Sequence, residues 1–178
     1  MEQVRKQMRR MEDLGPRFLT FSCHQRLPLL GRPEWRDAFA ESVATARARC
    51  GFRLLAWVAM PEHVHLILVP GNACKVSRIL VAIKQPIAQQ ALHRWRSEGA
   101  PILPKLEVSA GRHRYWQAGG GFDRLVRDDD ELEREVRYIH ANPVRRGLVA
   151  QPTDWPWSSA RWYAGDKAGA VPIDRANP

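Results

Sequence analysis

Two histidines, His63 and His65, stand one residue apart at the start of an apolar run, MPEHVHLILVP (residues 60–70). Side chains two apart in a β-strand point to the same side of the sheet, so both imidazoles are expected to share a face. Two neutral imidazoles on one face can chelate a divalent cation. Two unrelated histidines, each with a local hydrogen bond, would give the same pattern. Two ligands are too few for a metal site, so a third must come from another element.

A predicted helix in the C-terminal third of the chain offers the missing groups. Its apolar positions recur at helical spacing and predict a buried stripe: Leu132, Val136 and Ile139. Tyr138 and Asn142 lie beside this stripe, four residues apart, and are neighbours on the helix surface. The amide oxygen of Asn142 could bind a hard cation such as Mg²⁺ or Mn²⁺, and the hydroxyl of Tyr138 could act as a nucleophile. A tyrosine at a core edge and an asparagine before a proline are also common structural features, so spacing leaves both roles open.

The pattern of strands and helices predicts the scaffold for these residues. Strands are expected over residues 17–24, 52–60, 63–69 and 122–127, and helices over 33–50, 73–98 and 129–142. The last helix should be capped by the acidic run at 128–130 and stopped by Pro143. A Pro/Gly-rich connector fills residues 99–121. The order β-α-β-β-α-β-α favours class α+β, a ferredoxin-like sandwich with one added C-terminal helix.

The composition narrows the class of protein. The 178 residues are 44% hydrophobic, which suits one globular domain. Lys and Arg number 28 against 19 acidic residues, and the net charge of +9 favours nucleic acid as partner over a merely soluble basic surface. The chain has no run of 18 apolar residues and no G-x-x-x-x-G-K-[ST] phosphate loop, so we expect neither a membrane partner nor a nucleotide cofactor. Three unpaired cysteines and the polar N-terminus predict a cytoplasmic protein.

Longer motifs follow one another in a recognisable order between Arg17 and Tyr163. The chain carries MPEHVHLILVP, then WQ, then RDDDELEREVRYIHANPVRRGLV, then DWPWSSARWY. This series resembles the REP-associated tyrosine transposases, an IS200-like group whose signature is two histidines flanking one hydrophobic residue. The resemblance implies a ferredoxin-like fold with a catalytic helix laid across the histidine-bearing face.

The resemblance also implies residue roles. His63, His65 and Asn142 would bind Mg²⁺ or Mn²⁺, and Tyr138 would be the nucleophile. The implied activity is cleavage and rejoining of single-stranded DNA through a 5′-phosphotyrosine, beside hairpins formed by palindromic repeats, by a monomer or homodimer. A tyrosine titrates near pH 10, so the metal or a nearby base must help Tyr138 to lose its proton, and Glu135 is a candidate base.

Two other functions stay open from the residues alone. One is a non-catalytic nucleic-acid-binding module, and the other is a metal-dependent nuclease that uses water as its nucleophile.

Basic residues with interleaved aromatics are expected to contact the DNA. These candidates are Arg112, Arg114, Tyr115, Trp116, Arg145, Arg146, Arg161 and Trp162.

The resemblance divides the chain into three parts. Residues 1–14 would be a basic N-terminal arm, residues 15–163 the transposase domain, and residues 164–178 a tail. The arm and the tail fall outside the match. Either could bind DNA or be disordered.

Overall fold

An antiparallel sheet of four strands lies at the centre of the molecule, which a computed structural model describes over residues 15–72, 74–169 and 171–175. The strands are β1 (Arg17–Ser22), β2 (Arg53–Ala59), β3 (His63–Val69) and β6 (Phe122–Leu125), and their order across the sheet is β2-β3-β1-β6. The two central strands of the sheet are therefore β3 and β1. This arrangement confirms the α+β class and matches the predicted β-α-β-β-α-β order.

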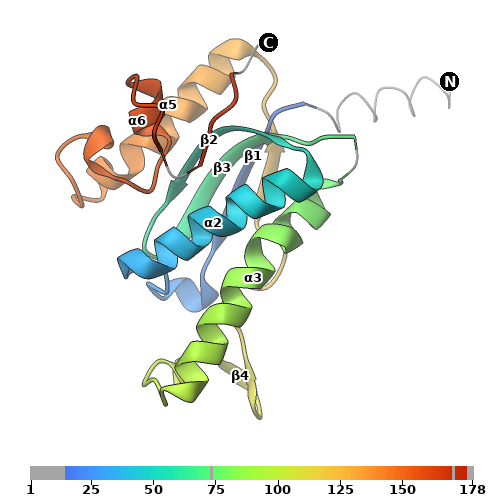
Figure 1. Ribbon diagram of the computed structural model, residues 1–178, viewed down its shortest axis with the longest axis vertical. Coiled ribbons are helices and arrows are strands. Elements are labelled where there is room, and N and C mark those ends of the chain that lie inside the picture. Colours follow the sequence, from blue (N-terminus) through green and yellow to red (C-terminus); the bar gives the residue numbers. More distant parts are fainter. Residues whose placement is uncertain (1–14, 73, 170, 176–178) are drawn as a thin grey trace, which may run out of the picture.

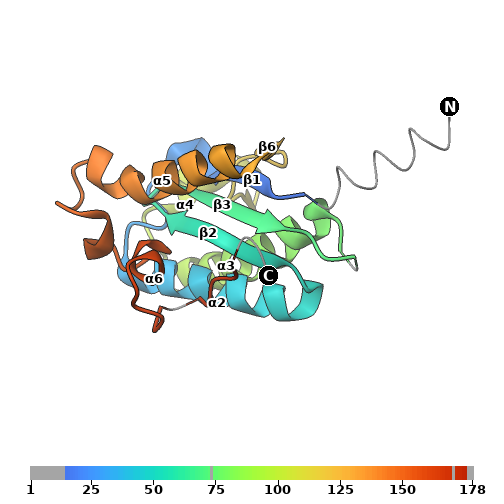
Figure 2. The same ribbon diagram turned by 90° about the horizontal axis from the view of Figure 1, so that it is seen from above.

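Helices cover both faces of the sheet and give the molecule three layers (Figure 1, Figure 2). α2 (Pro33–Cys50) and α3 (Val76–Ser97) pack together on one face. α5 (Asp129–Arg145) lies on the opposite face, over β2 and β3. Among the described residues, no helix is long and apolar enough to cross a lipid bilayer.

Short elements fill the connections between these layers. They are η1 (His24–Arg26), α4 (Leu103–Leu106), β4 (Glu107–Ser109), β5 (Arg112–His113), η2 (Pro152–Asp154) and α6 (Ala160–Tyr163). β4 and β5 form a small hairpin that projects beside the end of α3 (Figure 1). The sequence predicted an irregular connector here, because strands of two or three residues are too short to show an alternating pattern.

Alternation of side chains along β3 separates two hydrophobic cores. The residues of β3 that face α2 and α3 are Val64, Leu66 and Leu68, and all are fully buried in the larger core. Ile67 belongs to the smaller core beneath α5. His63 and His65 share that second face. The predicted division of the strand into an apolar face and a histidine-bearing face is confirmed.

α5 begins as the sequence predicted but ends later. The side chain of Asp128 accepts a hydrogen bond from the backbone of Glu131 (2.7 Å), which caps the first turn. The prediction that Pro143 stops the helix is wrong, because α5 continues to Arg145. A proline lacks only its own N–H, and the backbone N–H of Arg146 still bonds to the carbonyl of Asn142 (3.1 Å).

The C-terminal segment covers the free edge of β2. The backbone N–H of Ala59 donates to Trp157 (2.9 Å), and that of Asp174 donates to Leu54 (2.8 Å). Val171 is buried in the larger core. The described part of the predicted tail therefore packs against the sheet edge and the larger core, and the domain end at residue 163 stays a prediction. Residues 1–14 lie outside the described residues.

Candidate active site

β3 places His63 and His65 together on the face of the sheet that α5 covers. Their Nε2 atoms lie 3.1 Å apart, and both side chains are buried. Each Nδ1 has its own partner: that of His63 lies 3.0 Å from Oε1 of Glu62, and that of His65 lies 2.7 Å from Oγ1 of Thr20. The two partners therefore hold both rings in place and turn both Nε2 atoms toward the same point.

These partners decide which ring nitrogens are free to bind a cation. The Glu62 carboxylate only accepts, so Nδ1 of His63 donates to it and Nε2 of His63 carries a lone pair. The Thr20 hydroxyl can donate to Nδ1 of His65 or accept from it. When it accepts, the lone pairs of both Nε2 atoms face each other. Two donor atoms bonded at about 2.1 Å and at right angles to one cation lie about 3.0 Å apart, which the observed spacing fits.

Burial keeps this pair of imidazoles neutral. It lowers the pKa of His65 to about 3, and the charges of His63 and Arg26 act in the same direction. Burial also lowers the pKa of His63, although the adjacent Glu62 carboxylate opposes that effect. The neutral imidazole is the form that binds a metal. The pair can therefore bind a cation near neutral pH without first losing a proton.

Glu62 is a buried carboxylate to which the sequence pattern assigned no role. Its Oε1 lies 2.7 Å from Nη1 of Arg146 and 3.6 Å from Nη2 of Arg26. Burial opposes ionisation of this carboxylate, but His63 and Arg146 outweigh burial and hold its pKa below the ordinary value. Carboxylates that bond the second nitrogen of a ligand histidine orient that ligand. The position of Glu62 directly before His63 was the available sequence signal.

α5 brings Tyr138 onto the histidine pair. The ring centroids of Tyr138 and His65 are 5.5 Å apart, with the rings nearly perpendicular, and Phe18 contacts both rings. Tyr138 is 39% exposed, so its ring is both next to the buried histidines and open to a substrate. The guanidinium of Arg145 lies 5.5 Å from the Tyr138 ring centroid. Spacing in the sequence could not establish this proximity, which the tertiary structure supplies.

Asn142 lies one helical turn beyond Tyr138 and is buried. Its Nδ2 donates to the backbone carbonyl of Tyr138 (2.8 Å), so Oδ1 is the atom left to act as a ligand. Within the described residues, no group of three or more His, Cys, Asp or Glu side chains could hold a metal ion. The amide oxygen of Asn142 is of the ligand type that Mg²⁺ or Mn²⁺ takes.

Glu135, the candidate base, is engaged elsewhere. Its Oε1 lies 2.5 Å from Nη2 of Arg124 on β6, and Glu131 also pairs with Arg124. These contacts attach α5 to the edge of the sheet. The structure does not bring the carboxylate of Glu135 to the hydroxyl of Tyr138, so an ion-pairing role explains this residue better than proton transfer.

Two of the predicted DNA contacts belong to the core instead. Tyr115 is 2% exposed and stacks on Trp95, with ring centroids 5.7 Å apart. Trp116 is 7% exposed, packs edge-on against Phe21, and donates from Nε1 to the carbonyl of Lys84 (2.8 Å). The prediction that Tyr115 stacks on an unpaired base is wrong, because other side chains already cover its ring, and Trp116 keeps only a small exposed part.

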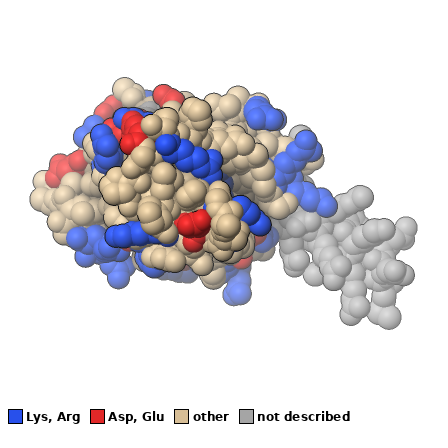
Figure 3. All heavy atoms as spheres, turned by 90° about the horizontal axis from the view of Figure 1, so that it is seen from below, with Lys and Arg blue, Asp and Glu red and all other residues tan. Residues whose placement is uncertain are grey.

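The remaining candidate DNA contacts differ in solvent exposure and in whether their side chains already have a partner. Arg112 on β5 and Arg145 are exposed, whereas Arg146 is held by Glu62 and Nε of Arg161 donates to a backbone carbonyl in η2. Trp162 is half-buried beneath the ammonium of a nearby lysine, and Arg114 is half-buried too. Figure 3 shows several Lys and Arg side chains and few acidic ones on the face seen from below. Such a surface favours contact with phosphates.

Comparison with known proteins agrees with this geometry. A family model described as "Transposase IS200 like" matches residues 18–101, which include the histidine pair. A REP-associated tyrosine transposase of Escherichia coli (strain K12) is 29% identical over 126 residues, 70% of this chain and 63% of the relative. A putative one of Haemophilus influenzae (strain ATCC 51907 / DSM 11121 / KW20 / Rd) is 28% identical over 124 residues, 69% of this chain and 66% of the relative. The chain thus spans just under two thirds of each relative's length.

A solved structure extends the match beyond the histidine-bearing half. It is a REP-associated tyrosine transposase bound to a REP hairpin. The two structures align with a TM-score of 0.65 and 25% sequence identity, over 93% of this chain and 87% of the transposase chain. Over residues 18–101 the chain is similar to the IS200-like transposases. Its relatives and the solved structure are REP-associated tyrosine transposases, so the resemblance predicted from the motifs is confirmed. The family model ends before α5. The roles considered for Tyr138 and Asn142 are therefore based on the structure and on the sequence motif, and not on that model.

Proposed function

We propose that this IS200-like protein cleaves and rejoins single-stranded DNA through a covalent 5′-phosphotyrosine on Tyr138. The contact between the rings of Tyr138 and His65 carries the proposal, because it joins a solvent-accessible nucleophile to a pair of converging imidazole nitrogens. His63, His65 and the amide oxygen of Asn142 would hold Mg²⁺ or Mn²⁺. A bound cation would polarise a nonbridging oxygen of the scissile phosphate and favour departure of the 3′ oxygen.

The residues of the chain account for the rest of the chemistry. The Tyr138 oxygen bonds to phosphorus while the bond from phosphorus to the 3′ oxygen breaks. The 3′ oxygen leaves with its electron pair and is protonated, and the phenol proton passes to solvent. The phosphodiester bond is exchanged and not hydrolysed, so a 3′-OH can reverse the step and rejoin strands without ATP.

The proposed substrate is single-stranded DNA with a hairpin formed by a palindromic repeat. Three observations support it: the curated relatives are REP-associated tyrosine transposases, the similar solved structure is bound to a REP hairpin, and the chain carries a net charge of +9. Arg145, beside the Tyr138 ring, would attract the scissile phosphate. Glu62 and Thr20 would act as positioning residues for the histidines.

A covalent-trapping assay tests the proposal. End-labelled single-stranded DNA with a palindromic repeat from beside the protein's own gene is incubated with the protein and Mn²⁺ or Mg²⁺, and the mixture is then denatured in detergent. We expect a labelled protein band that requires the metal. Tyr138→Phe should lower its yield by about 10⁴-fold or more, because the variant has no nucleophile.

Tyr163→Phe is the matched control, since Tyr163 is also an exposed tyrosine but donates its hydroxyl to the carbonyl of Leu55. It should retain the adduct. Metal-dependent cleavage without an adduct would instead indicate a nuclease that uses water. Binding of the same DNA without cleavage would indicate a non-catalytic DNA-binding module.

A further inference from the structure

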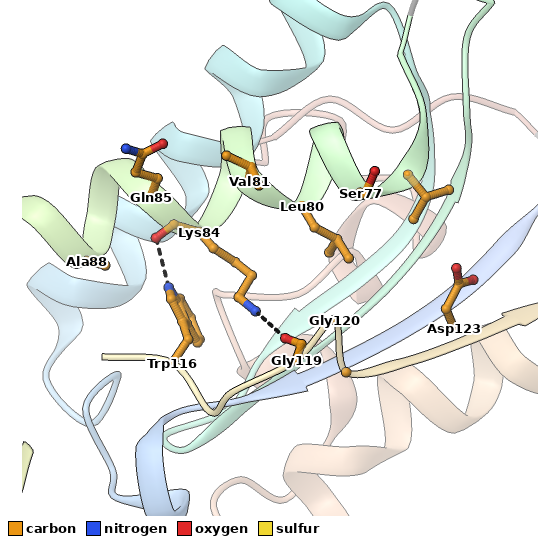
Figure 4. Close-up of a pocket in the computed structure, with 12 residues that line it drawn as sticks. Ser77, Leu80, Val81, Lys84, Gln85, Ala88, Trp116, Gly119, Gly120 and Asp123 are labelled. Atoms are coloured by element: carbon orange, nitrogen blue, oxygen red, sulfur yellow. Dashed lines mark hydrogen bonds between the residues drawn. The ribbon is translucent and has the colours of Figure 1, made fainter. Parts of the chain in front are cut away.

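A pocket of about 520 Å³ opens beside β6, between α3 and the loop at residues 119–121 (Figure 4). Its wall is mainly apolar and includes Leu80, Trp116 and Val81, whose side chain is 56% exposed. None of the roles assigned above uses this pocket. It lies toward the α3 side of the sheet, whereas Tyr138 lies on the α5 side.

Lys84 supplies the cation in this wall. In Figure 4 its side chain reaches from α3 toward the loop, where Nζ lies 3.4 Å from the carbonyl oxygen of Gly119. Nζ also lies 5.2 Å from the Phe21 ring centroid, and burial lowers the pKa of this ammonium. Over the described parts of the chain, no carboxylate forms an ion pair with Lys84, and Asp123 on the rim is paired with Arg17 (2.8 Å). A half-buried ammonium without a carboxylate partner favours an anionic ligand.

The loop beside the pocket lies close to β1 at Gly121. Gly121 has φ of +83°, and a Cβ at this position would overlap the carbonyl oxygen of Thr20 on β1. Only glycine permits this close approach of loop and strand. This approach shapes the β6 side of the pocket wall.

An aromatic path connects the pocket to the active site. Phe122 follows Gly121 on β6, the edge strand of the sheet, and is 53% exposed. Its ring packs edge-on against Phe18 (centroids 6.2 Å apart), and Phe18 in turn contacts Tyr138 (6.2 Å). Phe18 itself is buried, so Phe122 is the ring on which an unpaired base can stack. A strand that leaves Tyr138 can cross the β6 edge at Phe122 and continue toward the pocket.

We propose that the pocket binds one nucleotide of the single-stranded flank of the DNA substrate, with its phosphate at Lys84 and its base against Val81, while the preceding base stacks on Phe122. The inference rests on the proposed function and adds a location for the unpaired strand. Charge complementarity at Lys84 and the continuous path from Tyr138 identify DNA as the occupant. The face opposite α5 thus takes part in substrate selection.

Fluorescence anisotropy with two labelled DNAs tests the proposal. Both contain the same hairpin, and only one carries the single-stranded flank. We expect Lys84→Gln and Phe122→Ala each to weaken binding of the flanked DNA by about tenfold and to leave the bare hairpin unchanged. For Lys84→Gln, the slope of log affinity against log salt with the flanked DNA should fall by about 0.7, the value for one lost single-strand phosphate contact.

Two further variants separate a local effect at the pocket from a general loss of charge or of folding. Val81→Glu introduces a negative charge at the pocket. Because the Val81 side chain is exposed, the substitution should leave the fold intact, and it should weaken binding of the flanked DNA but not of the bare hairpin. Lys105→Gln removes an exposed lysine away from the pocket and should change neither affinity. Each variant's thermal unfolding is recorded beside its affinity.

Several results would overturn the proposal. One is equal weakening of both DNAs, and another is unchanged affinity for the flanked DNA. A third is light scattering that shows a dimer of the wild type lost in Val81→Glu with DNA binding intact, which would make the pocket an interface between copies. The wild-type adduct assay is independent of these variants. A retained adduct with no effect of Lys84→Gln would overturn this inference but not the proposed function.

Discussion

The two faces of the central sheet are built from the same strands but differ in chemistry. The face toward α2 and α3 is lined by apolar side chains of the larger core. The face toward α5 carries the histidine pair, the buried carboxylate of Glu62 and an exposed tyrosine beside a smaller core. β3 shows the contrast within one strand, since Leu66 faces the large core and His65 faces Tyr138.

This contrast indicates a division of labour. The larger core lies under α2 and α3, and burial of its apolar area offsets the free energy that the buried polar groups of the other face cost to desolvate. Those groups are satisfied by one another: Glu62 bonds His63 and Arg146, and Thr20 bonds His65. Substitutions on the two faces should therefore separate activity from stability.

Among the substitutions that compare the two faces, His65→Ala has the largest expected effect, and that effect is on activity. Loss of a metal ligand should lower the rate of adduct formation by about 10³-fold, because the cation's contribution to the transition state is several kcal/mol. Hairpin binding should be largely retained. The rate is measured by covalent trapping in Mn²⁺, and an unchanged rate would refute the metal assignment.

Leu66→Ala is the control for His65→Ala, because Leu66 is the next residue of β3 and its side chain lies on the other face of the sheet. It should lower the free energy of unfolding by about 2–5 kcal/mol, because it removes buried methyl groups and leaves a cavity. The rate of adduct formation per folded molecule should stay unchanged. If Leu66→Ala also abolished chemistry below its unfolding temperature, the two faces would not be separable.

Glu62→Gln should have an intermediate effect. The amide keeps the size of the side chain but loses the charge that orients His63, so the dissociation constant for Mn²⁺ should rise by about 10- to 100-fold. Isothermal titration calorimetry of the folded protein measures it. Glu133→Gln, on the exposed side of α5, is the matched control and should bind Mn²⁺ as tightly as the wild type. Equal affinity in Glu62→Gln would leave the carboxylate without a role at the site.

The smallest effect is a pH dependence of stability on the α5 face. Burial lowers the pKa of His140 to about 4, from 6.5. Between these values the unfolded chain binds a proton that the folded chain does not, so stability is lost as the pH falls from about 6.5 toward 4. His140→Gln should reduce this slope by at most about 1.4 kcal/mol per pH unit.

Urea unfolding of the metal-free protein between pH 7 and pH 4.5 measures that slope. Leu66→Ala should lower stability at every pH and leave the slope as in the wild type, since it removes no titratable group. A steeper slope in His140→Gln would contradict the assignment of this proton to His140.

Local patterns predicted much of the scaffold. The two-residue period placed His63 and His65 on one face, and the helical period placed Tyr138 beside the stripe of α5. Both predictions depend only on the repeat of a single element. The end of α5, the short hairpin of β4 and β5, and the packing of Val171 were mispredicted or missed, because short elements and long-range contacts leave no periodic signal.

Residue types and local periodicity were enough to identify the groups that could perform the chemistry and the face of the strand or helix on which each lies. The contact of the Tyr138 ring with His65, the ion pair of Arg146 with Glu62 and the burial of Tyr115 became known only from the folded chain. The difference lies in the range of each interaction. Backbone geometry fixes the direction of a side chain within one strand or helix. Contacts between residues far apart in the chain depend on how all the apolar faces pack together.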